Sequence, residues 1–201
     1  MIVMKIALTG GIACGKSLFA KFLRGLGIHV IDADDVVHEL EAPGGAAVSA
    51  IAARFGAAVL APDGGVDRPA LAARVFADSA ARADLESILF PLVRSHLGRA
   101  VAPRPPITIH IIPLLFESHW ETDYDILLCI ASPVDQQIDR MMTSRGYSRA
   151  HAEARLAAQW PVAEKAARCH YTVMNDSTPE QLRDEAKRLV AWLKEQLDHE
   201  C

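Results

Sequence analysis

A lysine and a serine follow a glycine-rich stretch near the amino terminus, at a spacing that can bind the phosphates of a nucleotide. Residues 10 to 17 read G-G-I-A-C-G-K-S and fit the pattern G-x-x-x-x-G-K-[ST] without a gap. In such a loop the glycines let successive backbone N–H groups point at one phosphate, where a helix begins with its positive dipole end. Lys16 can then reach the β- and γ-phosphates, and the Ser17 hydroxyl is placed to bind Mg²⁺. The pattern predicts a nucleotide site, and the alternative is a glycine turn that merely precedes a buried helix.

The residues on either side supply the strand and the helix that such a loop requires. The apolar stretch from Ile2 to Leu8 predicts a short strand. After the loop, apolar residues recur at helical spacing from Leu18 to Leu26, and Gly27 ends the pattern. We therefore expect a strand, the loop and a helix in direct succession.

A cluster of carboxylates ends the second predicted strand, which runs from Gly27 to Asp32 and continues into Asp34 and Asp35. In an open α/β sheet, ligands bind at the carboxyl ends of the strands. If the strand geometry continues, Asp32 and Asp34 share one face and Asp35 points elsewhere. The cluster predicts a carboxylate that takes a proton from an acceptor hydroxyl, and Asp34 is the candidate.

About 75 residues separate Asp32 from the next predicted strand at Ile107, whereas a whole βαβ unit needs only ~30. Amphipathic runs predict helices at 48–55, at 67–76 with Asp67 as cap and Phe76 facing inward, and at 85–97. Residues 102–106, A-P-R-P-P, are typical of a stiff linker. We expect residues 41–106 to form an inserted helical subdomain that holds an acceptor substrate. The alternative is an insertion that only stabilises the fold.

The second half of the chain predicts more strands and a basic helical hairpin. Strands are expected at 107–112, 124–131 and 171–175. Ser132-Pro133 is expected to cap the helix after the strand at 124–131, and a capping box at Thr178 starts the last helix. Between residues 137 and 168 the basic side chains outnumber the acidic ones, which predicts a lid that closes over a triphosphate. A solvated helical face is the alternative. The basic residues are Arg140, Arg145, Arg149, Arg155, Lys165 and Arg168.

Composition limits the class of protein. The 201 residues, 51% of them hydrophobic and 23% charged, are sufficient for one globular domain with a full core. A formal charge of −4 argues against a nucleic-acid coat protein. The longest apolar run, 107–116, falls short of the ~20 residues of a membrane span. The four cysteines form no C-x-x-C pair, so we expect a cytoplasmic protein. We also expect either a monomer or a small homo-oligomer.

These stretches together resemble the dephospho-coenzyme A kinases over nearly the whole chain. The residues that carry the resemblance are A-L-T-G-G-I-A-C-G-K-S (7–17), V-I-D-A-D (30–34), H-E-L-E-A-P-G (38–44), D-G-G-V-D-R-P-A-L-A-A-R-V-F (63–76), P-L-L-F-E (113–117) and R-L-A-A-Q (155–159). The resemblance implies a three-layer α/β/α P-loop fold with a five-stranded parallel sheet, a helical coenzyme-binding insertion and a lid. It also implies transfer of the γ-phosphoryl group of ATP, with Mg²⁺, to the ribose 3′-hydroxyl of dephospho-coenzyme A, the last step of coenzyme A synthesis.

The same resemblance assigns the site residues. It implies that the nucleotide is bound by Gly11, Ile12, Ala13, Cys14, Gly15, Lys16, Ser17 and Leu18. It implies that the catalytic residues are Asp34, Lys16 and Arg140, with Ser17 as the metal ligand. It implies that the acceptor and lid contacts come from Asp32, Arg68, Leu114, Arg155 and Gln159.

Some positions depart from the family pattern. Ala13 replaces a glycine, which strains the backbone if that residue needs a positive φ. Cys14 replaces a serine, and its place beside a helix start and Lys16 favours a thiolate, with a small buried residue as the alternative. Leu18 stands where a second hydroxyl is common. Ser144 stands where an arginine is usual and Arg145 follows it, so either Arg140 or Arg145 can be the arginine that meets the transferring phosphate.

Other functions fit parts of the sequence. Another P-loop kinase, acting on a nucleoside, nucleotide or sugar, would share the loop and the lid. A GTP-binding switch would read guanine with N-K-x-D, but the only asparagine, Asn175, is followed by Asp176. A paralogue that binds nucleotide without turnover would explain the departures at Ala13 and Cys14.

Overall fold

The computed structural model describes residues 4–76, 78–99 and 107–199. The chain forms two compact units, one of Met1–Ile31 with Pro103–Cys201 and the other of Asp32–Ala102. The predicted linker at 102–106 and the first residues of the predicted first strand, Ile2 and Val3, lie outside the described residues.

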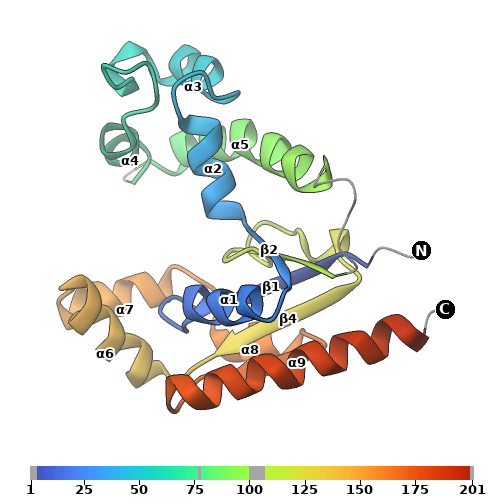
Figure 1. The fold of residues 1–201 in the computed structure, drawn as a ribbon. Coiled ribbons are helices and arrows are strands. Elements are labelled where there is room, and N and C mark those ends of the chain that lie inside the picture. Colours follow the sequence, from blue (N-terminus) through green and yellow to red (C-terminus); the bar gives the residue numbers. More distant parts are fainter. Residues whose placement is uncertain (1–3, 77, 100–106, 200–201) are drawn as a thin grey trace. The chain divides into compact units, whose positions relative to one another are not determined.

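A five-stranded parallel sheet forms the centre of the first unit (Figure 1). Its strands are β1 (Ile6–Gly10), β2 (His29–Asp32), β3 (Thr108–Ile111), β4 (Ile126–Ala131) and β5 (Tyr171–Met174), in the order β2-β3-β1-β4-β5. Strand β1 lies between β3 and β4, with Ile6 opposite both Ile109 and Ile126. Every residue of β1 and β4 is buried, as in parallel strands covered on both faces. The predicted five-stranded parallel sheet is confirmed.

Helices cover both faces of this sheet. Ile6 and Leu8 pack in one cluster with Phe19 of α1 (Lys16–Gly25) and Leu189 of α9 (Pro179–His199). Because side chains alternate along a strand, Thr9 points to the opposite face. There α8 (Val162–Ala167) packs against β1 and β4.

Helix α9 begins with the predicted capping box. Gln181 N donates to Thr178 Oγ1 at 3.3 Å, and Thr178 N donates to Gln181 Oε1 at 3.1 Å. This exchange satisfies one backbone donor at each end of the box, so the prediction at Thr178 is confirmed.

The predicted lid consists of α6 (Val134–Arg145), α7 (Arg149–Ala157) and α8; the short helix η2 (Glu121–Asp123) precedes β4. The predicted cap of α6 at Ser132-Pro133 is confirmed for Pro133 but not for Ser132. Pro133 occupies the cap position without a side-chain hydrogen bond, and the buried Ser132 hydroxyl instead donates to Asn175 O at 2.7 Å. The hydroxyl therefore joins the ends of β4 and β5.

The second unit is entirely helical. It contains α2 (Ala33–Glu41), α3 (Val48–Phe55), η1 (Ala57–Val59), α4 (Arg68–Phe76) and α5 (Ser79–Arg99). Asp67 caps α4 as predicted, because its carboxylate accepts from Ala70 N at 3.0 Å. The predicted inward orientation of Phe76 is wrong, since its side chain is 75% exposed. Phe76 follows the buried Leu71 by five positions, which corresponds to a rotation of about 140° around the helix axis. Phe76 therefore lies away from the buried face of α4.

The helical unit also begins earlier than the insertion in the sequence prediction. Its first residue is Asp32, whereas the predicted insertion starts near residue 41. Helix α2 packs against α5 and therefore belongs with the helices of this unit. Within the described ranges, the chain contains no helix with the length and apolar character of a membrane span.

Candidate active site

The phosphate loop, Gly10–Ser17, connects β1 directly to α1, as predicted. Two of its glycines are required by close neighbours. A Cβ on Gly10 would lie 2.3 Å from Ile130 O, and a Cβ on Gly15 would lie 2.3 Å from Asn175 Nδ2. Both also have positive φ, 147° and 93°. The glycines therefore let the loop pass close to β4 and to the end of β5.

Ala13 adopts a left-handed conformation, with φ 57°. The sequence analysis foresaw strain if this position needs a positive φ, and the structure shows that it does. This conformation costs a residue with a Cβ about 1 kcal/mol of conformational free energy. The surrounding contacts must offset this strain for the loop to keep its shape.

Lys16 and Ser17 begin α1 at the loop. The Lys16 ammonium donates to the carbonyl oxygens of Gly10 and Gly11, each at 2.8 Å. Ser17 and Leu18 are exposed, so the Ser17 hydroxyl is open to a ligand. The start of the helix adds partial positive charge beside the lysine. This end of α1 can bind an anion.

Cys14 does not match the predicted thiolate. Its side chain is fully buried, and this burial raises the pKa of the thiol although the positive charge of Lys16 opposes the change. The thiolate prediction is wrong because desolvation outweighs the nearby charge. The other interpretation, a small buried residue that fits the loop, agrees with the structure.

The lid helices pack directly on the phosphate loop. Ile138, Met141 and Ala152 form a small buried cluster, against which Ile12 and Ala13 of the loop are packed. Helices α6 and α7 of the lid therefore restrain the loop through apolar contacts.

Arg140 of α6 lies beneath the loop. One guanidinium nitrogen donates to Ala13 O at 3.3 Å and to Ser132 Oγ at 2.9 Å. The other donates to Gln136 Oε1 at 3.1 Å and to Asn175 O at 3.0 Å. Arg140 is thus committed to protein acceptors and holds the loop in place.

The other predicted lid arginines lie at the surface. Arg145 is exposed at the end of α6 and, within the described residues, its side chain makes no hydrogen bond or ion pair. The Ser144 hydroxyl donates back to Arg140 O inside the helix. Arg155 is exposed on α7, where its Nε donates to His151 Nε2 at 3.3 Å. Of these arginines, Arg145 has the charge most available to a ligand.

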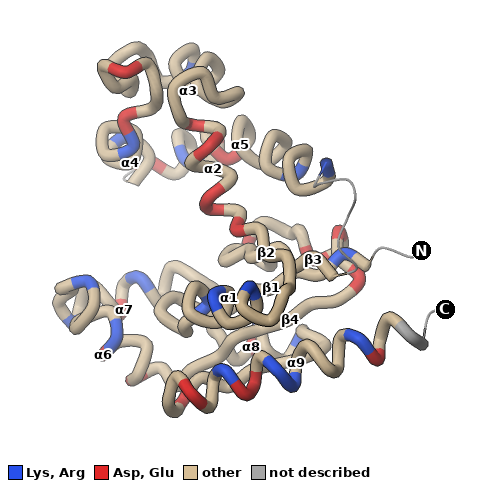
Figure 2. Tube along the Cα trace, in the orientation of Figure 1, with Lys and Arg blue, Asp and Glu red and all other residues tan. Residues whose placement is uncertain are grey.

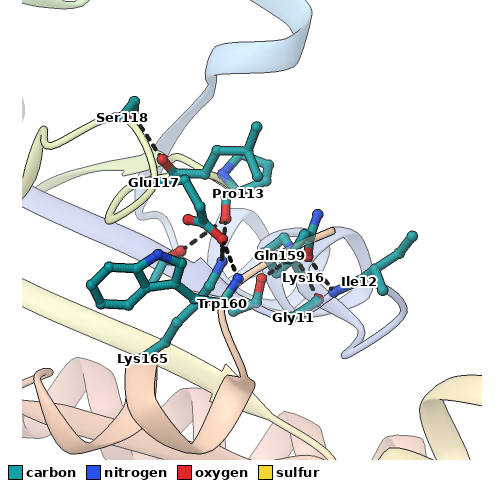
Figure 3. Close-up of polar contacts among 12 residues, drawn as sticks. Gly11, Ile12, Lys16, Pro113, Glu117, Ser118, Gln159, Trp160 and Lys165 are labelled. Carbon is teal, nitrogen blue, oxygen red and sulfur yellow. Dashed lines mark hydrogen bonds and ion pairs between the residues drawn. The ribbon is translucent and has the colours of Figure 1, made fainter. Parts of the chain in front are cut away.

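A chain of polar contacts joins the loop to distant segments (Figure 3). Ile12 N donates to Gln159 Oε1 at 3.2 Å, and Trp160 N donates to Glu117 Oε1 at 2.9 Å. The ammonium of the fully buried Lys165 lies 2.7 Å from the same Glu117 oxygen and donates to Pro113 O at 3.0 Å. Gln159 and Trp160 lie between α7 and α8, so these contacts fix that corner beside the loop.

Leu114 belongs to the same segment as Glu117. It is 41% exposed, while its neighbours Leu115 and Phe116 are buried. A single exposed leucine is ordinary on a protein surface, so this exposure leaves Leu114 accessible to a ligand without itself indicating one.

The predicted acidic residues belong to the helical unit. Asp32 is the N-cap of α2, and its carboxylate accepts from Asp34 N at 3.0 Å. Asp34 and Asp35 are exposed in the first helical turn, and Figure 2 shows the acidic residues along α2 in red. The strand-based prediction that Asp32 and Asp34 share a face is wrong, because the chain is helical from Ala33. Asp32 is engaged in capping, whereas Asp34 projects from the helix.

Arg68 is half-exposed at the start of α4 within this unit. Its Nε lies 2.9 Å from Glu41 Oε2, and its guanidinium also contacts His38 Nε2. Burial raises the pKa of Glu41 against the opposing charge of Arg68. The predicted acceptor-binding arginine is therefore oriented by a buried carboxyl group.

Three residues of the site were missed by the sequence analysis: Asn175, Glu117 and Lys165. From the sequence, Asn175 served only as evidence against a GTPase motif. Glu117 was named only as part of P-L-L-F-E, and Lys165 only as one of the basic lid residues. The Asn175 side chain donates to Cys14 O at 2.8 Å, across 161 positions of sequence. No local pattern reveals a contact of that range.

Ser17 is the predicted ligand of Mg²⁺ at the phosphate loop. The described part of the chain gathers no group of three or more His, Cys, Asp or Glu side chains that could hold a metal. Mg²⁺ usually takes only one or two protein ligands and completes its shell with phosphate oxygens and water. A single exposed hydroxyl at Ser17 therefore fits this ion when a nucleotide is bound.

Comparisons with known proteins agree on one family. The family model described as CoaE, dephospho-CoA kinase, matches residues 4–181. A protein named dephospho-CoA kinase from Anaeromyxobacter dehalogenans is 47% identical over 94% of this chain and 92% of that protein. Another from Geobacter sulfurreducens is 40% identical over 94% of this chain and 97% of that protein.

Solved structures give the same fold. The protein TT1252 from Thermus thermophilus superposes with a TM-score of 0.83 at 32% identity, over 96% of this chain and 99% of the other. A shikimate kinase from Acinetobacter baumannii, at 15% identity, superposes with a TM-score of 0.53 over 96% and 94%. The second likeness concerns the fold alone.

Proposed function

The chain belongs to the dephospho-CoA kinase family, and from this premise we propose that it phosphorylates the ribose 3′-hydroxyl of dephospho-coenzyme A with ATP. The bond between the γ-phosphorus and its bridging oxygen to ADP breaks, and a bond to the ribose 3′-oxygen forms. The hydroxyl proton passes to a carboxylate. The products are coenzyme A and ADP, so the reaction is the final step of coenzyme A biosynthesis.

The observation that carries this proposal is the family match across residues 4–181, on a chain whose phosphate loop is intact. Phosphoryl transfer depends on charge neutralisation and on in-line positioning. Backbone N–H groups of the loop and the Lys16 ammonium supply the charge neutralisation around the nucleotide phosphates. For this the ammonium must exchange the Gly10 and Gly11 carbonyls for phosphate oxygens.

Ser17 is the residue we propose to hold Mg²⁺ together with the nucleotide phosphates. When bound there, the ion would neutralise phosphate charge. The exposed hydroxyl at the start of α1 supports this assignment.

Asp34 is the proposed base. A ribose hydroxyl is a weak nucleophile, and a carboxylate within hydrogen-bond reach both orients it and receives its proton. The free position of Asp34 in the first turn of α2 supports this role, while the capping contact of Asp32 makes that carboxylate less suited to it. We propose that Asp32 instead helps to bind the acceptor.

Further acceptor contacts are proposed from the family resemblance. They come from Arg68, Leu114, Arg155 and Gln159. The orientation of Arg68 by Glu41, the exposure of Leu114 and Arg155, and the place of Gln159 beside Ile12 N support these roles.

The lid is the proposed source of the arginine that stabilises the transition state. Arg140 was the first candidate, but its donors are occupied by protein acceptors, so we propose that Arg140 holds the loop. The exposed Arg145 is then the better candidate for the transferring phosphate. A closed lid also protects the phosphoryl group from water.

We further propose a cytoplasmic protein, monomeric or a small homo-oligomer, that binds neither nucleic acid nor membranes. The net charge of −4 supports the proposal that the protein does not bind nucleic acid. The absence of a membrane-spanning helix within the described residues supports the proposal that it does not bind membranes.

An acceptor panel tests the proposed function. ADP release is measured with dephospho-coenzyme A, adenosine and shikimate as acceptors, each with ATP and Mg²⁺. We expect turnover with dephospho-coenzyme A alone, and a rise in melting temperature with that ligand by mass action. Turnover with a different acceptor would identify another P-loop kinase, and nucleotide binding without turnover would identify a non-catalytic paralogue.

A further inference from the structure

Two consecutive carbonyls of the phosphate loop are held by side chains from outside it. Ala13 O accepts from Arg140 at 3.3 Å, and Cys14 O accepts from Asn175 Nδ2 at 2.8 Å. Each of these carbonyls belongs to a peptide unit whose N–H lies on the next residue. The orientation of one end of the unit therefore fixes the other.

Asn175 is itself fixed on several sides. It follows β5, where its N–H donates to Ala131 O at 2.8 Å, and its carbonyl accepts from Ser132 Oγ at 2.7 Å and from Arg140 at 3.0 Å. Its side chain is buried, with the whole residue 7% exposed. Such a restrained amide can impose an orientation on the loop.

The contact sets the direction of the Gly15 N–H. In a trans peptide the C=O and the following N–H point in opposite directions. When Asn175 holds Cys14 O, the Gly15 N–H must point away from Asn175. Gly15 has no Cβ that could disturb this arrangement, since a Cβ would lie 2.3 Å from the Asn175 amide nitrogen.

The same contacts hold a strained segment. Ala13 is in the left-handed region, which is unfavourable for a residue with a Cβ, and each hydrogen bond to the loop contributes stabilising free energy. The bonds from Arg140 and Asn175 thus offset the strain before any ligand binds. A loop that is already in its binding shape loses less conformational entropy when the ligand arrives.

We propose that Asn175 is a positioning residue for phosphate binding: by holding the Cys14 carbonyl, it aims the Gly15 N–H at the phosphates of the nucleotide. The inference rests on the proposed function only in taking a nucleoside phosphate as the ligand. Asn175 acts through the Cys14–Gly15 peptide and does not touch the ligand.

The test compares ligand affinities in the full-length Asn175→Asp variant. This change keeps the shape of the side chain, but it replaces the N–H donor with an oxygen that repels Cys14 O. It also adds a negative charge beside the loop, so the uncharged Asn175→Ala variant is measured in parallel. We expect the Kd for ADP, from calorimetry, to rise at least about tenfold and the Kd for dephospho-coenzyme A to change less than about twofold. The neighbouring Asp176→Ala, at an exposed position, is the matched control and should leave both constants unchanged.

A second substitution separates positioning from simple stability. Ala13→Gly in the Asn175→Asp background relieves the left-handed strain and should recover part of the ADP affinity. Unchanged ADP binding by folded Asn175→Asp would overturn the proposal, and so would a loss of ADP and dephospho-coenzyme A affinity to the same degree. Asn175→Ala removes the donor without adding a charge, so it should show the same preferential loss of ADP affinity; a loss seen in Asn175→Asp alone would overturn the proposal as an effect of the added charge.

This measurement needs no turnover. A wild-type protein that binds ADP but does not phosphorylate dephospho-coenzyme A would contradict the proposed function, while the effect of Asn175 on ADP binding would still be decided.

Discussion

The Lys16 ammonium lies 2.8 Å from the carbonyl oxygen of Gly10, inside the loop that precedes its own helix. A second carbonyl, that of Gly11, accepts from the same nitrogen at the same distance. The lysine is therefore held at the phosphate loop by two backbone carbonyls.

Lys16→Ala should lower kcat by orders of magnitude and leave the fold intact. The substitution removes a positive charge that stabilises the transferring phosphoryl group, an effect of at least ~10²-fold for a single electrostatic contact. Steady-state kinetics and circular dichroism check both parts. The exposed Lys21→Ala, on the same helix, is the matched control. Near-full activity in a folded Lys16→Ala protein would remove the phosphate loop from the mechanism.

Arg140 and Arg145 should affect different properties. The family resemblance implies that Arg140 is catalytic, which would lower turnover more than ATP binding when it is replaced. Because Arg140 binds Ala13 O, we now expect Arg140→Ala to weaken nucleotide binding and lower the melting temperature. Arg145→Ala should leave both nearly unchanged and lower kcat, since a free lid arginine acts as charge develops. A large kcat loss at Arg140 with unchanged ADP affinity would restore the earlier assignment.

The loop and the sheet could be predicted because their signals are local. The G-x-x-x-x-G-K-S stretch, the buried strand runs and the capping box at Thr178 each depend on residues a few positions apart. The errors have the opposite character. The sequence left open whether Cys14 is a thiolate or a small buried residue, because local spacing shows the charge of Lys16 but not the burial that outweighs it. Ser132 was expected at a cap, but its hydroxyl donates to Asn175 O, 43 positions away.

The supporting residues of the site could not be predicted for the same physical reason. The Asn175 contact with Cys14 spans 161 positions, and the Trp160 contact with Glu117 spans 43. Such pairs form only when the sheet brings the strand ends together. Sequence spacing shows which residue types are present, but it does not show that these particular ones meet.

Thiol alkylation should select Cys169 over Cys14 and Cys129. Cys169 is partly exposed, and the side-chain hydrogen bond with Cys129, together with the charge of Lys165, lowers its pKa. Burial raises the pKa of Cys14, so that thiol should react slowly. Mass spectrometry of peptides after N-ethylmaleimide treatment ranks the three sites. An ordinary thiol has a pKa of ~8.5. The pH midpoint for labelling Cys169 should lie below that value. Faster labelling at Cys14 than at Cys169 would contradict this ranking.

Asp34→Asn should bind both substrates and turn over at least ~10²-fold more slowly, because the amide keeps the size of the side chain but cannot take a proton. Asp35→Asn, at the next exposed position of α2, is the control and should keep most activity. Asp32→Asn should be intermediate, since an asparagine can still cap the helix. The deepest loss at Asp32 or Asp35 would show that the base is assigned to the wrong carboxylate.

The central claim is transfer to one particular oxygen, and the position of the new phosphate tests it most directly. The wild-type protein is incubated with ATP, Mg²⁺ and dephospho-coenzyme A, and the product is examined by phosphorus–proton correlation NMR. The account predicts one new phosphate coupled to the ribose 3′ proton, formed in equal amount with ADP. A phosphate at any other position, or ADP released without a phosphorylated acceptor, would contradict it.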